Sequence, residues 1–337
     1  MNENMKKVLK SLILKSRVLK LAKHSRKGRL FVFNYHRIRE SNKNILFDRG
    51  VYGPNINRFK QEMRWIKKET RVLSEPELIE ILSHNRPLTE NCSLVTFDDG
   101  YRDSFELAFP ILHSLKMPAS FFIPTWHLTE RKLGWWDIVA YLIKQSKKDS
   151  FTFREEEICL SKGLFLINKL IGQIKEMETT RINGFITSLS EATGVPMPSA
   201  EVQSKELMTW DQIRELKKNG MSIGSHSHNH IILSKENIFD LRTELKTSKE
   251  ILEKELQCEV NSIAYPVGGY SHFDIETKNI TKELGFKIGY SYLTGINYFG
   301  KIDPFDVKRI GIQPQWPNLD YLLAFPERAF PSPRTPG

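Results

Sequence analysis

Short apolar segments alternate with amphipathic stretches along most of this chain of 337 residues, and this alternation strongly constrains its fold. Apolar segments of this length are typical of buried strands, and the amphipathic stretches are typical of helices that cover them. Strands are expected at residues 30–36, 92–97, 119–123, 221–225, 262–265, 286–290 and 307–312. Helices are expected at 104–115, 164–189, 210–220 and 235–256, with another ending near Gly285. The helix at 210–220 is expected to begin with a capping box between Thr209 and Gln212. The pattern predicts an α/β fold built from βα units.

Two adjacent carboxylates, Asp98 and Asp99, follow the second of these apolar segments, and Gly100 then ends the strand in a turn. Like charges placed side by side at a strand end are unfavourable unless a cation or a proton is shared between them. A metal ion would relieve the conflict, because one carboxylate can bind it while the other remains free to move protons. The alternative is an exposed turn rich in aspartate, which is common in proteins.

Three of the nine histidines lie within the sequence Ile223-Gly224-Ser225-His226-Ser227-His228-Asn229-His230. His226 and His230 are four residues apart, so on one helical turn both imidazoles would face the same way. His228 would then point elsewhere. Two histidines and one carboxylate leave an open fourth position, which is typical of catalytic rather than structural zinc. Such a pair also arises by chance, so the hypothesis depends on its combination with the Asp-Asp turn.

These motifs resemble those of the NodB-type polysaccharide deacetylases, a family of metal-dependent carbohydrate esterases. Thr96-Phe97-Asp98-Asp99-Gly100 matches the first family motif, and His226-Ser227-His228-Asn229-His230 matches the His-(Ser/Thr)-x-x-His motif. Ala264-Tyr265-Pro266-Val267-Gly268 meets only part of a third motif, Arg-x-Pro-x-Gly. The resemblance covers about residues 30–312. It implies a distorted (β/α) barrel and hydrolysis of carbon–nitrogen bonds, with removal of N-acetyl groups from the amino sugars of a polysaccharide, an oligosaccharide or a lipid-linked glycan.

The resemblance also implies a ligand set and a base. Asp99, His226 and His230 would hold a divalent metal, with zinc as the first expectation, and Asp98 would take the proton as water attacks the acetyl carbonyl. In a barrel of parallel strands the carboxyl ends of the strands meet on one face, so these residues are expected to converge there together with His36.

Other positions are assigned by analogy with the family, or as replacements for family residues that this chain lacks. The backbone N–H of Val267 would stabilise the oxyanion, with Tyr265 and Pro266 beside it on the substrate side. Ala264 stands where the family usually has an arginine that orients the base, and Arg309 on a predicted strand is the candidate to replace that arginine.

His36 is the candidate general acid. Many family members supply the acid from a Leu-x-His motif near the carboxyl terminus, but this chain has Arg309-Ile310-Gly311-Ile312-Gln313 there. His36 follows the first predicted strand and would protonate the leaving amine. The alternative is a structural histidine that forms hydrogen bonds at the strand end.

The chain is expected to divide into three parts. Residues 1–29 form a basic amphipathic segment, residues 30–325 form the barrel, and residues 326–337 form a flexible Pro-rich tail. A mostly helical insertion is expected in the barrel at about 126–205. Within it Trp135 and Trp136 could stack on sugar rings, although buried packing is the more common role of large aromatics.

Positive charge is concentrated at the start of the chain. Residues 1–29 contain ten Lys or Arg and one acidic residue, and therefore carry nearly all of the formal net charge of +10. A basic amphipathic helix there would either contact an anionic membrane surface or pack on the barrel. Nucleic-acid binding is not expected, because no binding motif accompanies the charge. The three cysteines form no close pair, which favours a cytoplasmic location. The basic segment would then place the protein peripherally on the inner membrane face.

Two other functions stay open from the sequence. Ala264 and the missing carboxyl-terminal histidine are also compatible with a carbohydrate-binding barrel that has lost turnover. A metal hydrolase that cleaves an amide in a non-sugar substrate would show the same motifs, because the motifs contact only the acyl group.

Overall fold

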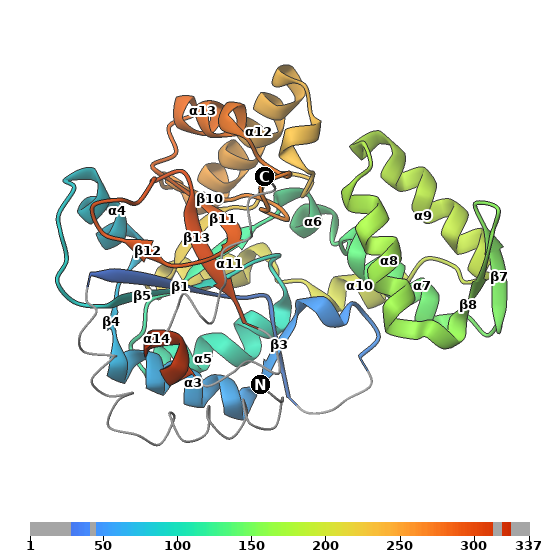
Figure 1. Cartoon of the computed structure of the whole chain (residues 1–337), viewed down its shortest axis with the longest axis horizontal. Helices are drawn as coiled ribbons and strands as arrows, with labels where there is room; N and C mark the ends of the chain where they lie inside the picture. Colours follow the sequence, from blue (N-terminus) through green and yellow to red (C-terminus); the bar gives the residue numbers. More distant parts are fainter. Residues whose placement is uncertain (1–27, 41–44, 313–318, 325–337) are drawn as a thin grey trace, which may run out of the picture.

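A computed structural model of the chain describes residues 28–40, 45–312 and 319–324 (Figure 1). The predictions for the basic amphipathic segment, except its last two residues, and for the Pro-rich tail lie outside the described residues.

Seven parallel strands form a closed barrel, which confirms the predicted α/β barrel. The strand order is β1-β13-β11-β10-β9-β6-β5, and β5 pairs with β1 to close the ring. Two short strands extend it, β12 (Asn297–Tyr298) antiparallel to β1 and β4 (Arg71–Val72) parallel to β5. The barrel strands are β1 (Arg29–Tyr35), β5 (Cys92–Phe97), β6 (Ser120–Ile123), β9 (Ser222–Ser225), β10 (Ser262–Ala264), β11 (Ile288–Thr294) and β13 (Val307–Gly311).

The pairing of β1 with β5 places two predicted functional segments at the same level. The register runs from Leu30 opposite Cys92 to Tyr35 opposite Phe97, so the residues that follow each strand, His36 and Asp98, leave the barrel together. The backbone N–H of Asp98 donates to the Tyr35 carbonyl at 3.0 Å and continues the pairing by one residue. Strand closure therefore brings the first strand of the barrel to the Asp-Asp turn.

Helices and short segments cover the outside of the barrel. The helices are α3 (Ile56–Glu69), α4 (Glu75–Ser83), α5 (Phe109–Ser114), α11 (Trp210–Lys218), α12 (Ile238–Leu256), α13 (Ile275–Glu283) and α14 (Leu319–Ala324). The shorter elements are β2 (Arg37–Arg39), η1 (Arg49–Val51), β3 (Tyr52–Asn55), η2 (Ser104–Ala108) and η4 (Leu233–Lys235). The Thr209 side chain caps α11 in the predicted capping box with Gln212. The core contains stacked aromatics, among them Phe97 and Phe121 with ring centroids 4.8 Å apart.

The helical segment expected at 104–115 is present but irregular. It begins as a π-helix, η2, and continues as α5 with Pro110 in its first turn. Proline has no backbone N–H to donate, so a regular helix cannot run through it without losing a hydrogen bond.

A mostly helical lobe lies between β6 and β9 and projects to one side of the barrel (Figure 1). The segment begins with α6 (Thr125–Glu130), which stays at the barrel in contact with α12 (Figure 1). The elements of the lobe are α7 (Trp135–Gln145), β7 (Ser150–Phe153), β8 (Glu156–Cys159), η3 (Leu160–Lys162), α8 (Gly163–Lys175), α9 (Thr179–Thr193) and α10 (Ala200–Glu206). The lobe has an apolar cluster of its own, which includes Leu170, Phe185 and Leu189. The helical stretch expected from 164 to 189 is two helices, because Glu178 has an extended backbone where α9 begins.

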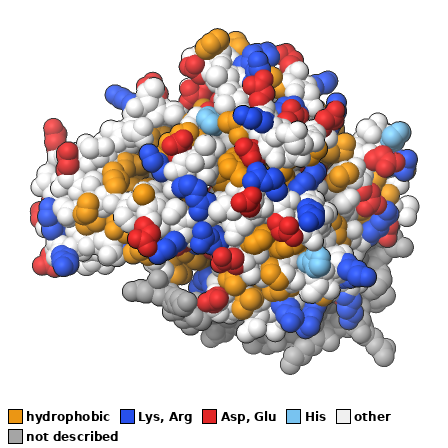
Figure 2. Space-filling view, turned by 180° about the vertical axis from the view of Figure 1, so that it is seen from behind, with side chains coloured by type: hydrophobic (Ala, Val, Ile, Leu, Met, Phe, Trp, Pro, Cys, Tyr) orange, Lys and Arg blue, Asp and Glu red, His pale blue; other side chains and the backbone are white. Residues whose placement is uncertain are grey.

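Charged side chains of both signs are interspersed on the face seen from behind in Figure 2. This distribution agrees with the sequence, in which the excess of positive charge falls mainly on residues 1–29. Among the described helices, none has both the length and the apolar character that a membrane span requires.

Candidate metal and catalytic site

The Asp-Asp turn adopts a backbone conformation that directs it into the barrel mouth. Asp99 and Gly100 have φ values of 70° and 68°, so two consecutive residues are in the left-handed region. Glycine enters this region without steric cost, whereas Asp tolerates it because its short polar side chain can interact locally. A Cβ atom on Gly100 would also lie 2.5 Å from Leu128 Cδ1. The turn therefore requires glycine directly after the two carboxylates.

The histidine segment follows β9 as a loop, so the predicted helical turn from His226 to His230 is wrong. Ser227 and His230 have φ values of 62° and 54°, which no α-helix contains. The Ser227 hydroxyl accepts the His230 backbone N–H at 3.0 Å, and Asn229 is held by the Glu244 carboxylate of α12. A tight turn thus brings both imidazoles to one side, as the helix was expected to do.

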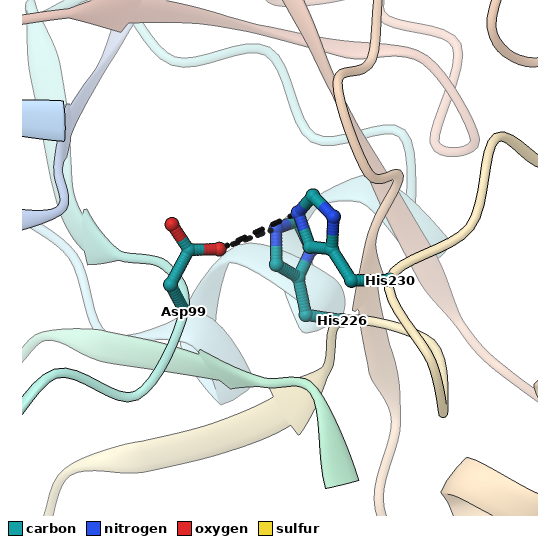
Figure 3. A group of neighbouring side chains, drawn as sticks. All are labelled: Asp99, His226 and His230. Atoms are coloured by element: carbon teal, nitrogen blue, oxygen red, sulfur yellow. Dashed lines mark ion pairs between the residues drawn. The ribbon is translucent and has the colours of Figure 1, made fainter. Parts of the chain in front are cut away.

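Asp99, His226 and His230 form a buried triad (Figure 3). Asp99 Oδ1 lies 3.4 Å from His226 Nε2 and 3.4 Å from His230 Nε2. A tetrahedral ion with bonds of about 2.0–2.1 Å keeps its ligand atoms about 3.3–3.4 Å apart. Asp99 Oδ1 is also buried without a hydrogen-bond partner among the described residues. The donor set and its spacing therefore fit a divalent metal.

The imidazole of His226 is oriented by a backbone carbonyl. Its Nδ1 lies 2.8 Å from the Ala264 carbonyl oxygen, and since that oxygen can only accept, Nδ1 carries the proton. Nε2 is then left with a lone pair toward Asp99, as a metal ligand requires. His228 lies outside the triad, because its Nδ1 contacts Thr125 Oγ1 at 2.7 Å.

Asp98 is 1% exposed and is held by two partners inside the barrel. Arg309 Nη1 donates to Asp98 Oδ1 at 2.8 Å, and Asn34 Nδ2 donates to Asp98 Oδ2 at 3.1 Å. Burial raises the pKa of Asp98, but the charges of Arg309, His226 and His36 outweigh it, so the pKa lies below its usual value. The carboxylate is therefore ionised at neutral pH and has a fixed orientation.

The triad combines groups whose pKa values are shifted in different directions. Burial raises the pKa of Asp99, but the adjacent imidazole of His226 and the neighbouring histidines His36 and His230 bring it well below the usual range. Burial lowers the pKa of His230 to about 3, with a further contribution from His226. Burial also lowers the pKa of His226, but the nearby carboxylates of Asp98 and Asp99 outweigh this effect and raise it. Asp99 is thus ionised and His230 neutral, the states in which both bind metals.

A cavity of about 230 Å³ opens at this end of the barrel and holds the triad. Besides Asp98 and the triad, four further residues predicted from the sequence line it, His36, Tyr265, Val267 and Arg309, whereas Pro266 does not. His36 Nε2 lies 3.9 Å from Asp98 Oδ2 and 4.0 Å from Asp99 Oδ2. The lining residues that the sequence did not indicate are Asp48, Gly50, Val51, Asn168, Ile171, Lys175 and Tyr292.

The turn after β10 is strained at Val267. Val267 has a φ of 59°, which is rare for a β-branched residue, and the Gly268 N–H contacts the Pro266 carbonyl at 2.5 Å. Gly268 cannot carry a side chain, because a Cβ atom there would lie 2.5 Å from the Tyr292 backbone nitrogen. Pro266 therefore takes part in the turn through its carbonyl, and Val267 lines the cavity.

The two tryptophans of the lobe differ in their environment. Trp136 is buried, and its ring centroid lies 4.4 Å from that of His230. Trp135 is half-buried, packs edge-on against Trp136 and lines the cavity. Buried packing thus describes Trp136, and Trp135 keeps a surface toward the cavity. The contact of Trp136 with His230 does not follow from local sequence, because the two residues are 94 positions apart.

Comparison with known proteins decides the family. Residues 85–157 and 162–289, more than half of the chain, match the polysaccharide deacetylase family. The chain belongs to this family. YxkH of Bacillus subtilis, which is named after the same family, is 22% identical over 232 residues, 68% of this chain and 56% of that protein. The chain therefore spans just over half the length of this curated relative.

Two solved structures share the fold. The Streptococcus pyogenes deacetylase PplD, in complex with acetate, is 21% identical with a TM-score of 0.59 and covers 89% of this chain and 99% of its own. IcaB from Ammonifex degensii is 18% identical with the same TM-score of 0.59 and covers 89% and 98%. At these identities the similarity concerns the fold alone, and the functional argument depends on the site and the family.

Replacing either histidine of the triad should remove the metal. His226→Ala and His230→Ala each delete one of three ligand atoms, so bound zinc per chain after dialysis should fall far below that of the unchanged protein. His228→Ala is the matched control and should retain the ion. Elemental analysis of the purified proteins measures this, and unchanged zinc content in both triad variants would rule out the ligand set.

Proposed function

We propose that this protein is a zinc-dependent deacetylase that removes N-acetyl groups from the amino sugars of a polysaccharide, an oligosaccharide or a lipid-linked glycan. The observation that carries the proposal is the buried Asp99–His226–His230 triad with the ionised Asp98 beside it in one open cavity. Membership of the polysaccharide deacetylase family supports an acetylated glycan as substrate. The structure of PplD with acetate adds a relative of the same fold that binds the expected product.

Zinc is the metal that the donor set favours. Two imidazole nitrogens and one carboxylate oxygen are a common catalytic zinc set, and they leave one position open. When bound there, the ion would polarise the acetyl carbonyl and lower the pKa of a coordinated water to about 7. The remaining steps are assigned to side chains and backbone groups of this chain.

Asp98 acts as the general base in this proposal. It lies beside the triad, with Oδ2 at 3.9 Å from His226 Nε2, and it is ionised at neutral pH. Arg309 holds its other oxygen and so takes the place of the family arginine that is missing at Ala264. Asn34 bridges the two, because its Oδ1 accepts from Arg309 Nη1 at 2.9 Å while its Nδ2 donates to Asp98. With Arg309 bound to Asp98, the alanine at position 264 no longer favours an inactive binding barrel.

Val267 and His36 complete the set of groups around the acetyl carbon. Val267 faces the cavity from its strained turn, and its backbone N–H makes no hydrogen bond to the described residues, so it is free to donate to an oxyanion. His36 lines the same cavity within 4.0 Å of both carboxylates and carries a partly exposed side chain. It would donate the proton that the departing amine requires.

Asp98→Asn tests the proposal most directly. The amide keeps the shape of the side chain but cannot take a proton, so acetate release from N-acetylated glycans should fall by about a hundredfold to ten-thousandfold. Zinc content should be unchanged. The substrates are chitooligosaccharides, lipid-linked amino sugars and nucleotide sugars, with an N-acetylated non-sugar amide for comparison, each with and without added zinc.

Asp149→Asn, an exposed aspartate of the lobe, is the matched control and should retain full activity. Near-normal turnover by Asp98→Asn would refute the base, and release from the non-sugar amide alone would refute the glycan substrate.

His36→Ala should slow release of the amine by about a hundredfold or more, because no proton is then delivered to the leaving nitrogen. 4-Nitrophenyl acetate separates this role from others, since its leaving group needs no protonation and its hydrolysis should change little. His84→Ala, an exposed histidine, serves as control. An equal loss on the amide and on the ester would mean that His36 does not act as the acid.

A cytoplasmic location at the inner membrane face, through residues 1–29, is part of the same proposal. It is supported by the concentration of basic residues in that segment and would suit a lipid-linked glycan. In flotation with anionic liposomes, the full chain should rise with the vesicles, and a form without residues 1–29 should not. Equal recovery of both forms would eliminate membrane contact.

A further inference from the structure

A fully buried carboxylate of the lobe is bonded to two segments of the barrel. Asp137, in the first turn of α7, is 0% exposed. Its Oδ2 accepts a hydrogen bond from the Tyr101 hydroxyl at 2.7 Å, and its Oδ1 accepts one from the Asp48 backbone N–H at 2.9 Å. Tyr101 directly follows the Asp-Asp-Gly turn, and Asp48 lines the cavity. One side chain therefore connects the lobe to both the metal-ligand turn and the cavity wall.

From Asp137 a chain of contacts continues to His230, first through hydrogen bonds and then through ring packing. Trp136 Nε1 donates to the Tyr101 hydroxyl oxygen at 2.7 Å, so this hydroxyl accepts from the indole while it donates to Asp137. The Trp136 ring lies against His230, with a centroid separation of 4.4 Å and an angle of 51° between the planes. Asp137 thus fixes the Tyr101 hydroxyl, and this hydroxyl in turn fixes the indole of Trp136 by a hydrogen bond.

His230 depends on packing for its orientation more than His226 does. His226 Nδ1 is fixed by the Ala264 carbonyl, whereas His230 Nδ1 has no hydrogen-bond partner among the described residues. Its ring contacts are Trp136 at 4.4 Å, His226 at 4.7 Å and His127 at 6.4 Å. Of these rings, the indole of Trp136 is the closest. A shift of Trp136 would therefore release the ring of His230.

Tyr101 is also held through its ring, which makes it a firm link in this chain. The Arg37 guanidinium lies 4.5 Å from the Tyr101 ring centroid and 4.6 Å from that of Tyr52. Arg37 is fixed in turn by ion pairs with Asp103, at 2.6 Å, and with Glu206 of α10. The ring of Tyr101 would therefore stay in place if only its hydroxyl contact were lost.

We propose that Asp137 is a positioning residue of the metal site, which acts through Tyr101 and Trp136 to fix the imidazole of His230. The lobe then does more than border the cavity, because it completes the support of one metal ligand. This inference rests on the metal-dependent function proposed above. Groups that orient a metal ligand from outside typically change metal affinity or activity by about 10–100-fold when they are replaced.

Two substitutions break the chain at different atoms. Asp137→Asn keeps the shape but exchanges one acceptor oxygen for an N–H donor, so either Tyr101 or Asp48 loses its acceptor. Tyr101→Phe removes the hydroxyl that links Asp137 to Trp136 and leaves the ring against Arg37. Asp149→Asn changes an exposed aspartate in the same lobe and serves as the matched control.

The test is the Kd for Zn²⁺, measured by chelator competition on the full chain, together with the visible spectrum of the Co²⁺-substituted protein. Asp137→Asn and Tyr101→Phe should each raise the Kd by about 10–100-fold and alter the Co²⁺ bands, with Asp149→Asn unchanged. The double variant Asp137→Asn/Tyr101→Phe should have a Kd for Zn²⁺ no higher than that of the single variant with the higher Kd, because both substitutions break the same link.

Three results would overturn the inference. Unchanged Kd and Co²⁺ spectra with a lowered melting temperature would assign Asp137 to lobe stability only, and would leave the proposed function intact. Absence of Zn²⁺ binding by the unchanged protein would remove the metal-dependent function and this inference together. If Asp137→Asn does not fold, Tyr101→Phe decides by the same comparison, and a Kd equal to that of the unchanged chain refutes the link.

Discussion

The burial of two neighbouring carboxylates, Asp98 and Asp99, is the constraint on which the rest of the site depends. They are 1% and 4% exposed, and ionised groups at this depth need compensating charge. Asp98 is compensated by Arg309 at 2.8 Å. Asp99 has two imidazoles at 3.4 Å and an oxygen without a hydrogen bond, which is where a cation fits. Each carboxylate is thus suited to a different task, one to proton transfer and the other to metal binding.

Barrel closure is what makes this arrangement possible. Because β1 pairs with both β5 and β13, residues from the beginning, the first third and the end of the chain meet inside the barrel. Asn34, Asp98 and Arg309 share hydrogen bonds there although the outer two are 275 residues apart. The lobe adds a second set of long-range contacts through Asp137, Tyr101 and Trp136. The fold brings the three side chains of the triad together, and these long-range contacts surround them.

Features that depend on local sequence could be predicted, and those that depend on distant contacts mostly could not. The strand that precedes the Asp-Asp turn and the capping box at Thr209 follow from short patterns, and both are present. The spacing of His226 and His230 indicated a shared ligand site, but the backbone between them is a turn with positive φ, which residue spacing alone cannot distinguish from a helix. The sequence signalled Arg309 only as a substitute for a missing arginine. It gave no sign of Asn34 or Asp137, because polar residues in strands and helices are usually identified as functional only when their partners are known.

The central claim is that one ion is held by Asp99, His226 and His230. Crystals grown with zinc, measured on both sides of the zinc absorption edge, test it without reference to any substrate. The account predicts an anomalous peak at about 2.0–2.2 Å from one oxygen of Asp99 and from Nε2 of both histidines. A peak elsewhere on the chain, with these three side chains free of metal, would contradict it.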